Sequence, residues 1–136
     1  MRNKSRTVSS ERRGATAVEF ALTAPVFIVF LLAAFEFGWL NVIRHTADNA
    51  AYEAARTAMV PGATAAEAVA KANGLLNIVG ARGASITVTP STLTADTDEI
   101  TVAIDIPMAQ NGLIVPRFTS KTTLRSSSSL RTERAE

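Results

Sequence analysis

An acidic side chain lies at the start of a long apolar segment, and no other position in this sequence is a clearer candidate for a chemical role. Glu19 follows Arg12, Arg13 and Gly14 and directly precedes Phe20. Moving a carboxylate into the hydrocarbon region of a membrane is costly, so an acid at this place requires a partner or a role. The alternative is an incidental glutamate whose side chain reaches back to the lipid headgroups.

The rest of the chain has no arrangement typical of catalysis. His45 is the only histidine and cysteine is absent, which excludes a thiol nucleophile, an iron–sulfur cluster and the usual structural zinc site. Asp96, Asp98 and Glu99 lie close in sequence but lack the glycine and the final glutamate of an EF-hand calcium loop. We therefore expect a protein that is not an enzyme and that uses no metal, cofactor or small-molecule substrate.

The apolar segment has the length of a membrane span. The 16 residues from Phe20 to Phe35 carry no charge, and the segment continues to Ile43. These residues form a helix of about 36 Å at roughly 1.5 Å per residue, against a hydrocarbon thickness of about 30 Å. About 100 residues remain, too few to cover an apolar helix of this length in a soluble protein. We predict a transmembrane helix over residues 15–43.

Three residues give this helix individual features. Pro25 removes one amide donor and favours a kink. Trp39 is expected in the aromatic belt at the far interface. Glu36 is expected near the same interface, solvated or paired with a partner, and about 100° around the helix from Glu19, so the two acids do not form one site.

The charges predict the orientation. The chain has 14 basic and 12 acidic residues among 136, but residues 1–14 hold five basic residues and one acid. The positive-inside rule places this basic leader in the cytoplasm and residues 44–136 on the far side of the membrane. A short basic tail without interleaved aromatic residues does not indicate nucleic-acid binding.

Residues 12–20 resemble the cleavage site of type IV prepilins and pseudopilins. In that family a membrane peptidase cuts after the glycine, which implies a cut between Gly14 and Ala15. Glu19 then becomes mature position five, where the family's glutamate pairs with the new N-terminal ammonium of a neighbouring subunit and neutralises both charges.

The longer phrase RRGATAVEFALTAPVFIVFLLAAFEFGWL, followed by an alanine-rich helix and a β-rich end, is similar to the TadE-like family. Members are minor pseudopilins of tight-adherence (Flp-type) pilus systems, and a TadF-like paralogue has nearly the same layout. The resemblance implies a role in pilus assembly, with a prepilin peptidase, other pilins, the inner-membrane assembly platform and the lipid bilayer as partners. It leaves open whether the protein enters the filament.

Two other classes of protein remain open. One is a generic single-pass anchored binding domain that keeps residues 1–14. The other is a secreted protein released by signal peptidase beyond Trp39, although the apolar stretch is longer than usual and Glu19 is atypical of such signals. The N-terminal residue of the mature protein distinguishes all three classes.

The exported part is expected to be α+β. Ile43 and a run of alanines recur at spacings of three and four, so the first helix continues as an amphipathic helix until Pro61 and Gly62. A capping box at Thr64 begins a second helix that ends around residues 80–83. Three strands are expected to follow as an antiparallel meander, which gives a pilin-like lollipop.

The three expected strands rest on different sequence patterns. The first two strands alternate apolar and polar residues around Ile86 and Ile104. The third is expected from about Arg117 to Leu130, with Phe118 facing the core and the serines 126–129 at a polar strand end.

Overall fold

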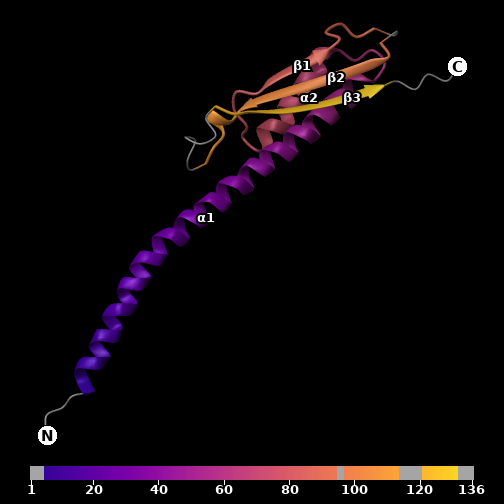
Figure 1. Ribbon diagram of the computed structural model, residues 1–136. Helices are drawn as coiled ribbons and strands as arrows, with labels where there is room; N and C mark the ends of the chain where they lie inside the picture. The colour runs from indigo at the N-terminus through magenta and orange to yellow at the C-terminus, as the bar shows by residue number, and fades with distance from the viewer. Residues whose placement is uncertain (1–4, 95–96, 114–120, 132–136) are drawn as a thin grey trace. The chain divides into compact units, whose positions relative to one another are not determined.

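A computed structural model describes residues 5–94, 97–113 and 121–131, with side chains from residue 14 onward. The elements follow in the order α1 (Ser5–Ala58), α2 (Ala65–Ile78), β1 (Ser85–Thr89), β2 (Glu99–Pro107), the 3₁₀ turn η1 (Met108–Gln110) and β3 (Thr123–Arg131) (Figure 1). This is the expected α+β order of a long apolar helix, a short helix and a three-stranded antiparallel sheet.

The chain divides into two compact units, residues 1–35 and residues 36–136. The first consists of the N-terminal part of α1. The second contains the rest of α1 and all other elements, so the unit that holds the sheet begins at Glu36, eight residues before the exported domain expected from the hydropathy.

Helix α2 has well-defined ends. The Thr64 hydroxyl accepts a hydrogen bond from the Glu67 amide at 3.3 Å, and the Glu67 carboxylate accepts one from the Thr64 amide at 2.8 Å. This is the expected capping box, which satisfies two amides that the helix itself leaves without acceptors. The helix ends where Gly80 adopts a φ of 63° and the Ala81 amide donates to the Leu76 carbonyl at 3.1 Å, a turn that closes helices through a left-handed residue.

The sheet has the strand order β1-β2-β3, with both neighbouring pairs antiparallel. One row across it joins Ile86, Ile104 and Ser126. This confirms the meander. Strand β2 is central and supplies four buried apolar side chains at alternate positions: Ile100, Val102, Ile104 and Ile106.

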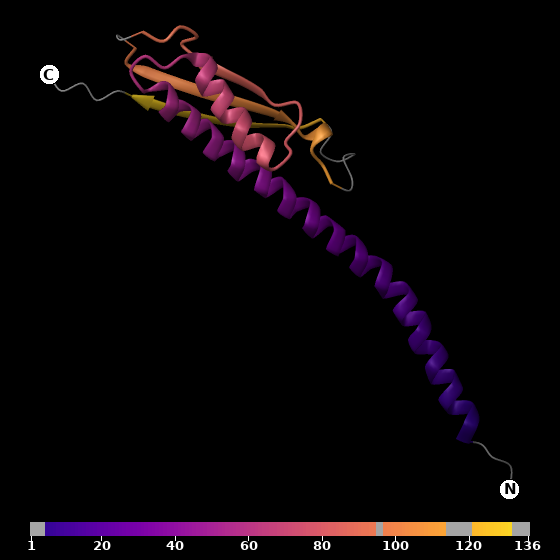
Figure 2. The same cartoon turned by 180° about the vertical axis from the view of Figure 1, so that it is seen from behind.

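Both helices lie on the same face of the sheet, as the two opposite views agree (Figures 1 and 2). The alanine stripe faces this core and is completely or almost completely buried: Ala47, Ala50, Ala51, Ala54, Ala55 and Ala58, together with Ile43. From α2 the buried residues are Ala68, Ala72 and Leu76. Small side chains leave the helices room to lie close to the sheet, so the predicted packing role of the alanines is confirmed.

The serine run does not have the expected position. Ser126–Ser129 lie in the middle of β3, where Ser126 is buried and its hydroxyl donates to the Asp48 carboxylate of α1 at 2.7 Å. The prediction of a polar strand end was wrong because the serines alternate between the helix-facing side and the outer side of the sheet. The expected start of this strand at Arg117, and the expected core position of Phe118, lie outside the described residues.

The outer face of the sheet is polar. Arg125 contacts Asp105 at 2.9 Å, Arg131 contacts Glu99 at 3.7 Å, and the hydroxyls of Thr101 and Ser129 are 3.1 Å apart. These are pairs between directly opposed residues of β2 and β3.

Candidate functional site

The residues of the expected cleavage site lie on consecutive turns of α1. Gly14, Ala15, Glu19 and Phe20 are helical and exposed. The helix also includes Arg12 and Arg13, whose side chains are outside the described part of the structure. Gly14, Ala15, Glu19 and Phe20 are therefore presented on the surface of one helix.

No packing contact among the described residues requires a glycine at position 14. A Cβ atom built there would have no neighbour within 4 Å, and φ at this position is not in the left-handed region. Glycine inside a helix costs up to about 1 kcal/mol relative to alanine. The residue thus weakens the helix locally and is not required by any contact in the structure.

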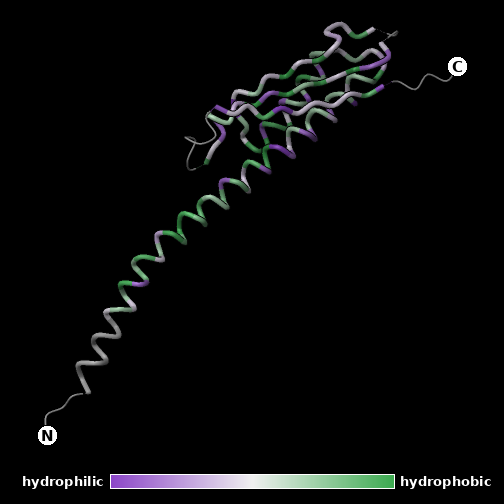
Figure 3. Tube along the Cα trace, in the orientation of Figure 1, coloured by the Kyte–Doolittle hydropathy of each residue, from purple (hydrophilic) through white to green (hydrophobic). Residues whose placement is uncertain are grey.

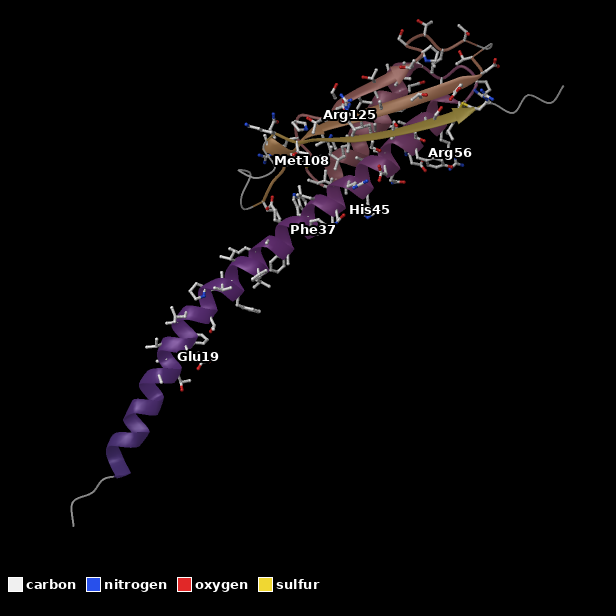
Figure 4. The ribbon with its side chains drawn as sticks, in the orientation of Figure 1. Glu19, Phe37, His45, Arg56, Met108 and Arg125 are labelled. Carbon is white, nitrogen blue, oxygen red and sulfur yellow. The ribbon has the colours of Figure 1, made fainter. Side chains whose placement is uncertain are left out.

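Glu19 is exposed on α1 (Figure 4). In the part of the chain whose side chains are described, no basic group lies within 4.0 Å of its carboxylate. Its backbone carbonyl accepts a hydrogen bond from the Thr23 hydroxyl at 2.9 Å. The carboxylate is therefore available for a group supplied by another molecule.

Helix α1 continues through Pro25. Proline has no amide hydrogen, so the carbonyl of Ala21 loses its usual donor at this turn. On the same turn, the Thr23 hydroxyl donates to the carbonyls four and three positions earlier, those of Glu19 at 2.9 Å and Phe20 at 3.4 Å. Hydroxyl groups of this kind are common in membrane helices, where they supplement the backbone hydrogen bonds.

The two remaining sequence-predicted residues belong to the second unit. Glu36 accepts a hydrogen bond from the Leu113 amide through Oε2 at 3.0 Å. Trp39 is half-buried, and its indole Nε1 donates to the Asn111 carbonyl at 3.0 Å. The sequence predicted Glu36 near the outer interface, solvated or paired with a partner, and Trp39 in the aromatic belt. In the structure both side chains form hydrogen bonds with the loop after η1.

Asn111 is the structural residue that the sequence did not reveal. It is buried, and its side chain makes three hydrogen bonds: Nδ2 to the Arg82 and Pro107 carbonyls, both at 2.8 Å, and Oδ1 from the Arg82 amide at 2.7 Å. An asparagine before a glycine is typical of an ordinary turn, so no local sequence pattern predicts that this side chain is buried.

The described residues contain no cluster of three or more histidine, aspartate or glutamate side chains suited to a metal ion. Asp96, one member of the acidic loop considered in the sequence, lies outside those residues.

One helix among the described residues is long and apolar enough to cross a membrane, from Gly14 to Ala58, and its most apolar window is not buried in the structure. Figure 3 shows hydrophobic residues along this part of α1. The length, the composition and the exposure together identify a single-pass membrane protein.

The model of the family described as TadE-like protein matches residues 14–56. No curated protein matches the chain. No solved structure matches it either. The resemblance drawn from the sequence is therefore confirmed over residues 14–56, where the chain is similar to TadE-like proteins, and this similarity indicates a protein related to Tad pilus systems.

Proposed function

We propose that this protein is a minor pseudopilin that acts in the assembly of a tight-adherence pilus through protein–protein contacts. The observation that carries the proposal is where the family match begins. It starts at Gly14, the residue directly before the proposed cut, and leaves out residues 1–13, so the matched part consists of the glycine of the cleavage site and the helix that would remain after cleavage. The proposal assigns no catalytic step to this chain.

The first step is removal of the leader by a prepilin peptidase. Hydrolysis of the Gly14–Ala15 peptide bond leaves a carboxylate on Gly14 and an ammonium group on Ala15. The backbone there is helical, so it must become extended to enter a protease active site, and a glycine lowers the cost of that change. The absence of any neighbour around Gly14 supports an external reason for this residue.

The second step is pairing of Glu19. Its exposed carboxylate, with no basic partner among the described side chains, receives the N-terminal ammonium of a neighbouring subunit. Each charge alone is costly at the membrane boundary, and pairing reduces that cost for both. This contact sets the register between adjacent membrane helices.

The topology follows from the charges. The basic leader faces the cytoplasm, α1 crosses the inner membrane, and the sheet lies on the far side, where it meets other pilins and the assembly platform. The membrane helix and the sheet would make these contacts whether the protein enters the filament or stays in the membrane.

The test is the N-terminal residue and intact mass of the membrane-extracted protein from cells with and without the prepilin peptidase. We expect Ala15 as the first residue only when the peptidase is present. A start at Met1 in both strains would instead indicate an uncleaved anchored binding domain. A start beyond Trp39 would indicate a secreted protein.

A further inference from the structure

Strand β3 forms one edge of the sheet, and half of its backbone groups have no described strand beside them. Among the described strands, β3 pairs with β2 alone. The Met108 amide donates to the Thr122 carbonyl at 2.9 Å, one position beyond the pairing of Pro107 with Thr123. Opposed residues of an antiparallel pair are alternately bonded and non-bonded, so the even-numbered residues of β3 bond to β2. The amides and carbonyls of the odd-numbered residues, such as Ser127, point to the free edge.

This edge lacks the features that usually protect a terminal strand. Natural proteins block such edges with proline, lysine, bulges or charges that point toward the core. Strand β3 contains no proline and no lysine. Its charged residues, Arg125 and Arg131, pair with acids on the outer face of the sheet, and their side chains are 82% and 77% exposed. Among the described residues, no element other than β2 forms a backbone hydrogen bond with β3, so the edge can accept another strand.

The helix layer is wider than the sheet that it covers. Strands lie roughly 4.8 Å apart, so three strands occupy roughly 14 Å. Two helices of roughly 10 Å diameter occupy roughly 20 Å. Strand β3 is the strand nearest to α1, as Figures 1 and 2 and the hydrogen bond between Asp48 and Ser126 show. Helix α1 can therefore cover one more strand beyond β3.

A groove of about 390 Å³ lies at the same edge, between α1 and the start of β3. Its apolar lining includes Phe37, Leu40 and Leu124, and Phe37 is 70% exposed (Figure 4). The remaining lining residues are Asn41, Arg44, Met108, Thr122, Thr123 and Arg125. All of them belong to the compact unit of residues 36–136. The helix-facing side chains of an added strand would fill this groove.

We propose that the free edge of β3 binds an extended segment of another protein on the same side of the membrane, which becomes the fourth strand of the sheet. On its helix-facing side the segment carries apolar side chains opposite Leu124 and Leu130, and the one beside Leu124 enters the groove. On its outer side it carries acidic side chains opposite Arg125 and Arg131, six positions apart. Backbone hydrogen bonds give the affinity in such complexes, and the alternate side chains give the specificity. The proposal depends neither on leader cleavage nor on pilus assembly.

A second copy of this chain does not fit the edge. Helix α1 and β3 run in the same direction, because Phe37 lines the groove with Thr123 and Asp48 contacts Ser126. Antiparallel pairing of two β3 strands would send the two α1 helices in opposite directions, whereas both must enter one membrane. Pairing of β3 with β1 of a second copy would place two helices, roughly 20 Å wide, under every three strands, roughly 14 Å wide. The occupant is therefore a different protein.

The experiment uses the full chain in detergent micelles and a synthetic nine-residue peptide that alternates valine with threonine and has two of the threonines, six positions apart, replaced by glutamate. Amide hydrogen exchange is followed for single residues by NMR. In the free protein, we expect slow exchange at Ser126 and Ser128, which bond to β2, and fast exchange at Ser127 and Ser129. Saturating peptide should slow exchange at Ser127 and Ser129 by about tenfold or more.

Ser127→Pro is the main variant, because proline removes a donor that faces the edge but no hydrogen bond to β2. It should weaken binding of the labelled peptide about tenfold, as measured by fluorescence anisotropy. Slow exchange at Ser126 in this variant shows that the sheet is intact. Ser127→Val is the matched control, since it keeps the backbone amide and should bind the peptide like the wild type.

Two altered peptides separate the backbone from the side chains. Methylation of the peptide nitrogens that face β3 removes the backbone donors and should abolish binding. Lysine in place of both glutamates should weaken binding about tenfold, because the pairs with Arg125 and Arg131 change from attraction to repulsion.

Four results would overturn the proposal. Slow exchange at Ser127 in the free protein would show that the chain itself already occupies the edge. Equal binding of the methylated and unmethylated peptides would show a contact that does not involve strand pairing. Equal binding of the glutamate and lysine peptides would exclude an acidic partner. Dimers of the full chain that Ser127→Pro separates would assign the edge to a second copy.

Discussion

The indole nitrogen of Trp39 donates a hydrogen bond to the backbone carbonyl of Asn111 at 3.0 Å, across 72 positions of the sequence. The Asn111 side chain then holds both backbone groups of Arg82. Asn111 thus ties together the helix that leaves the membrane, the loop before β1 and the turn after β2.

Asn111→Ala is expected to destabilise the second unit. It removes three side-chain hydrogen bonds, two to the Arg82 backbone and one to the Pro107 carbonyl, at a cost of about 2–4 kcal/mol. Asn49→Ala, an exposed residue of α1, should change stability by less than about 0.5 kcal/mol. Denaturant unfolding of the full chain in detergent measures both. Equal effects of the two changes would contradict the role of Asn111.

Gly83→Ala and Gly74→Ala are expected to change the free energy of unfolding in opposite directions. Gly83 has a φ of 67°, and a Cβ there would lie 3.1 Å from the Pro107 ring and 2.6 Å from the Gln110 side chain. Alanine should therefore destabilise by about 1–3 kcal/mol. Gly74 lies in α2 with nothing within 4 Å of an added Cβ, so alanine should stabilise by up to about 1 kcal/mol. Unfolding midpoints measured side by side test the pair.

Gly14→Ala should slow processing only in part, whereas Gly14→Leu should abolish it. A Cβ atom added at position 14 meets no described atom within 4 Å. A block would therefore arise in the peptidase. Gly38→Leu is the control, since Gly38 also has open space around it and should be processed normally. The ratio of precursor to mature protein on immunoblots gives the answer, and normal processing of Gly14→Leu would exclude cleavage at this site.

Glu19→Ala should be cleaved at close to the normal rate but should impair pilus assembly. The exposed carboxylate makes no ion pair among the described side chains, so its loss leaves the fold intact. Glu19→Gln, which keeps the shape but not the charge, should be as defective as alanine. Pilus yield per cell, normalised to mature protein, is the measurement. Wild-type yield from either variant would remove the charge-pairing role.

The sequence predicted the elements that have local signals. The alanine spacing indicated the buried stripe of α1, Thr64 and Glu67 indicated the start of α2, and the alternation around Ile104 indicated the central strand. The sequence did not predict the position of a side chain where that position depends on a residue far away in the chain. Ser126 reads as a polar residue, and its burial follows only from the Asp48 carboxylate on α1.

The candidate site divides in the same way. Gly14 and Glu19 were recognised from their spacing within one helix, which needs no tertiary structure. Glu36 and Trp39 were expected near the outer interface, but hydropathy has no information about their hydrogen-bond partners in residues 111–113. Their partners come from a loop more than 70 positions away, and only the folded sheet brings that loop to α1.

The contact between Asp48 and Ser126 also has a consequence for biogenesis. It joins the first described helix to the last described strand, 78 positions apart, and β2 packs between elements from both ends of the chain. The sheet cannot be completed until β3 has been delivered to the same side of the membrane as the end of α1. Until β3 has been synthesised, the earlier segments therefore lack their final partners, and a chaperone that binds unfolded chains would meet this protein in an open state.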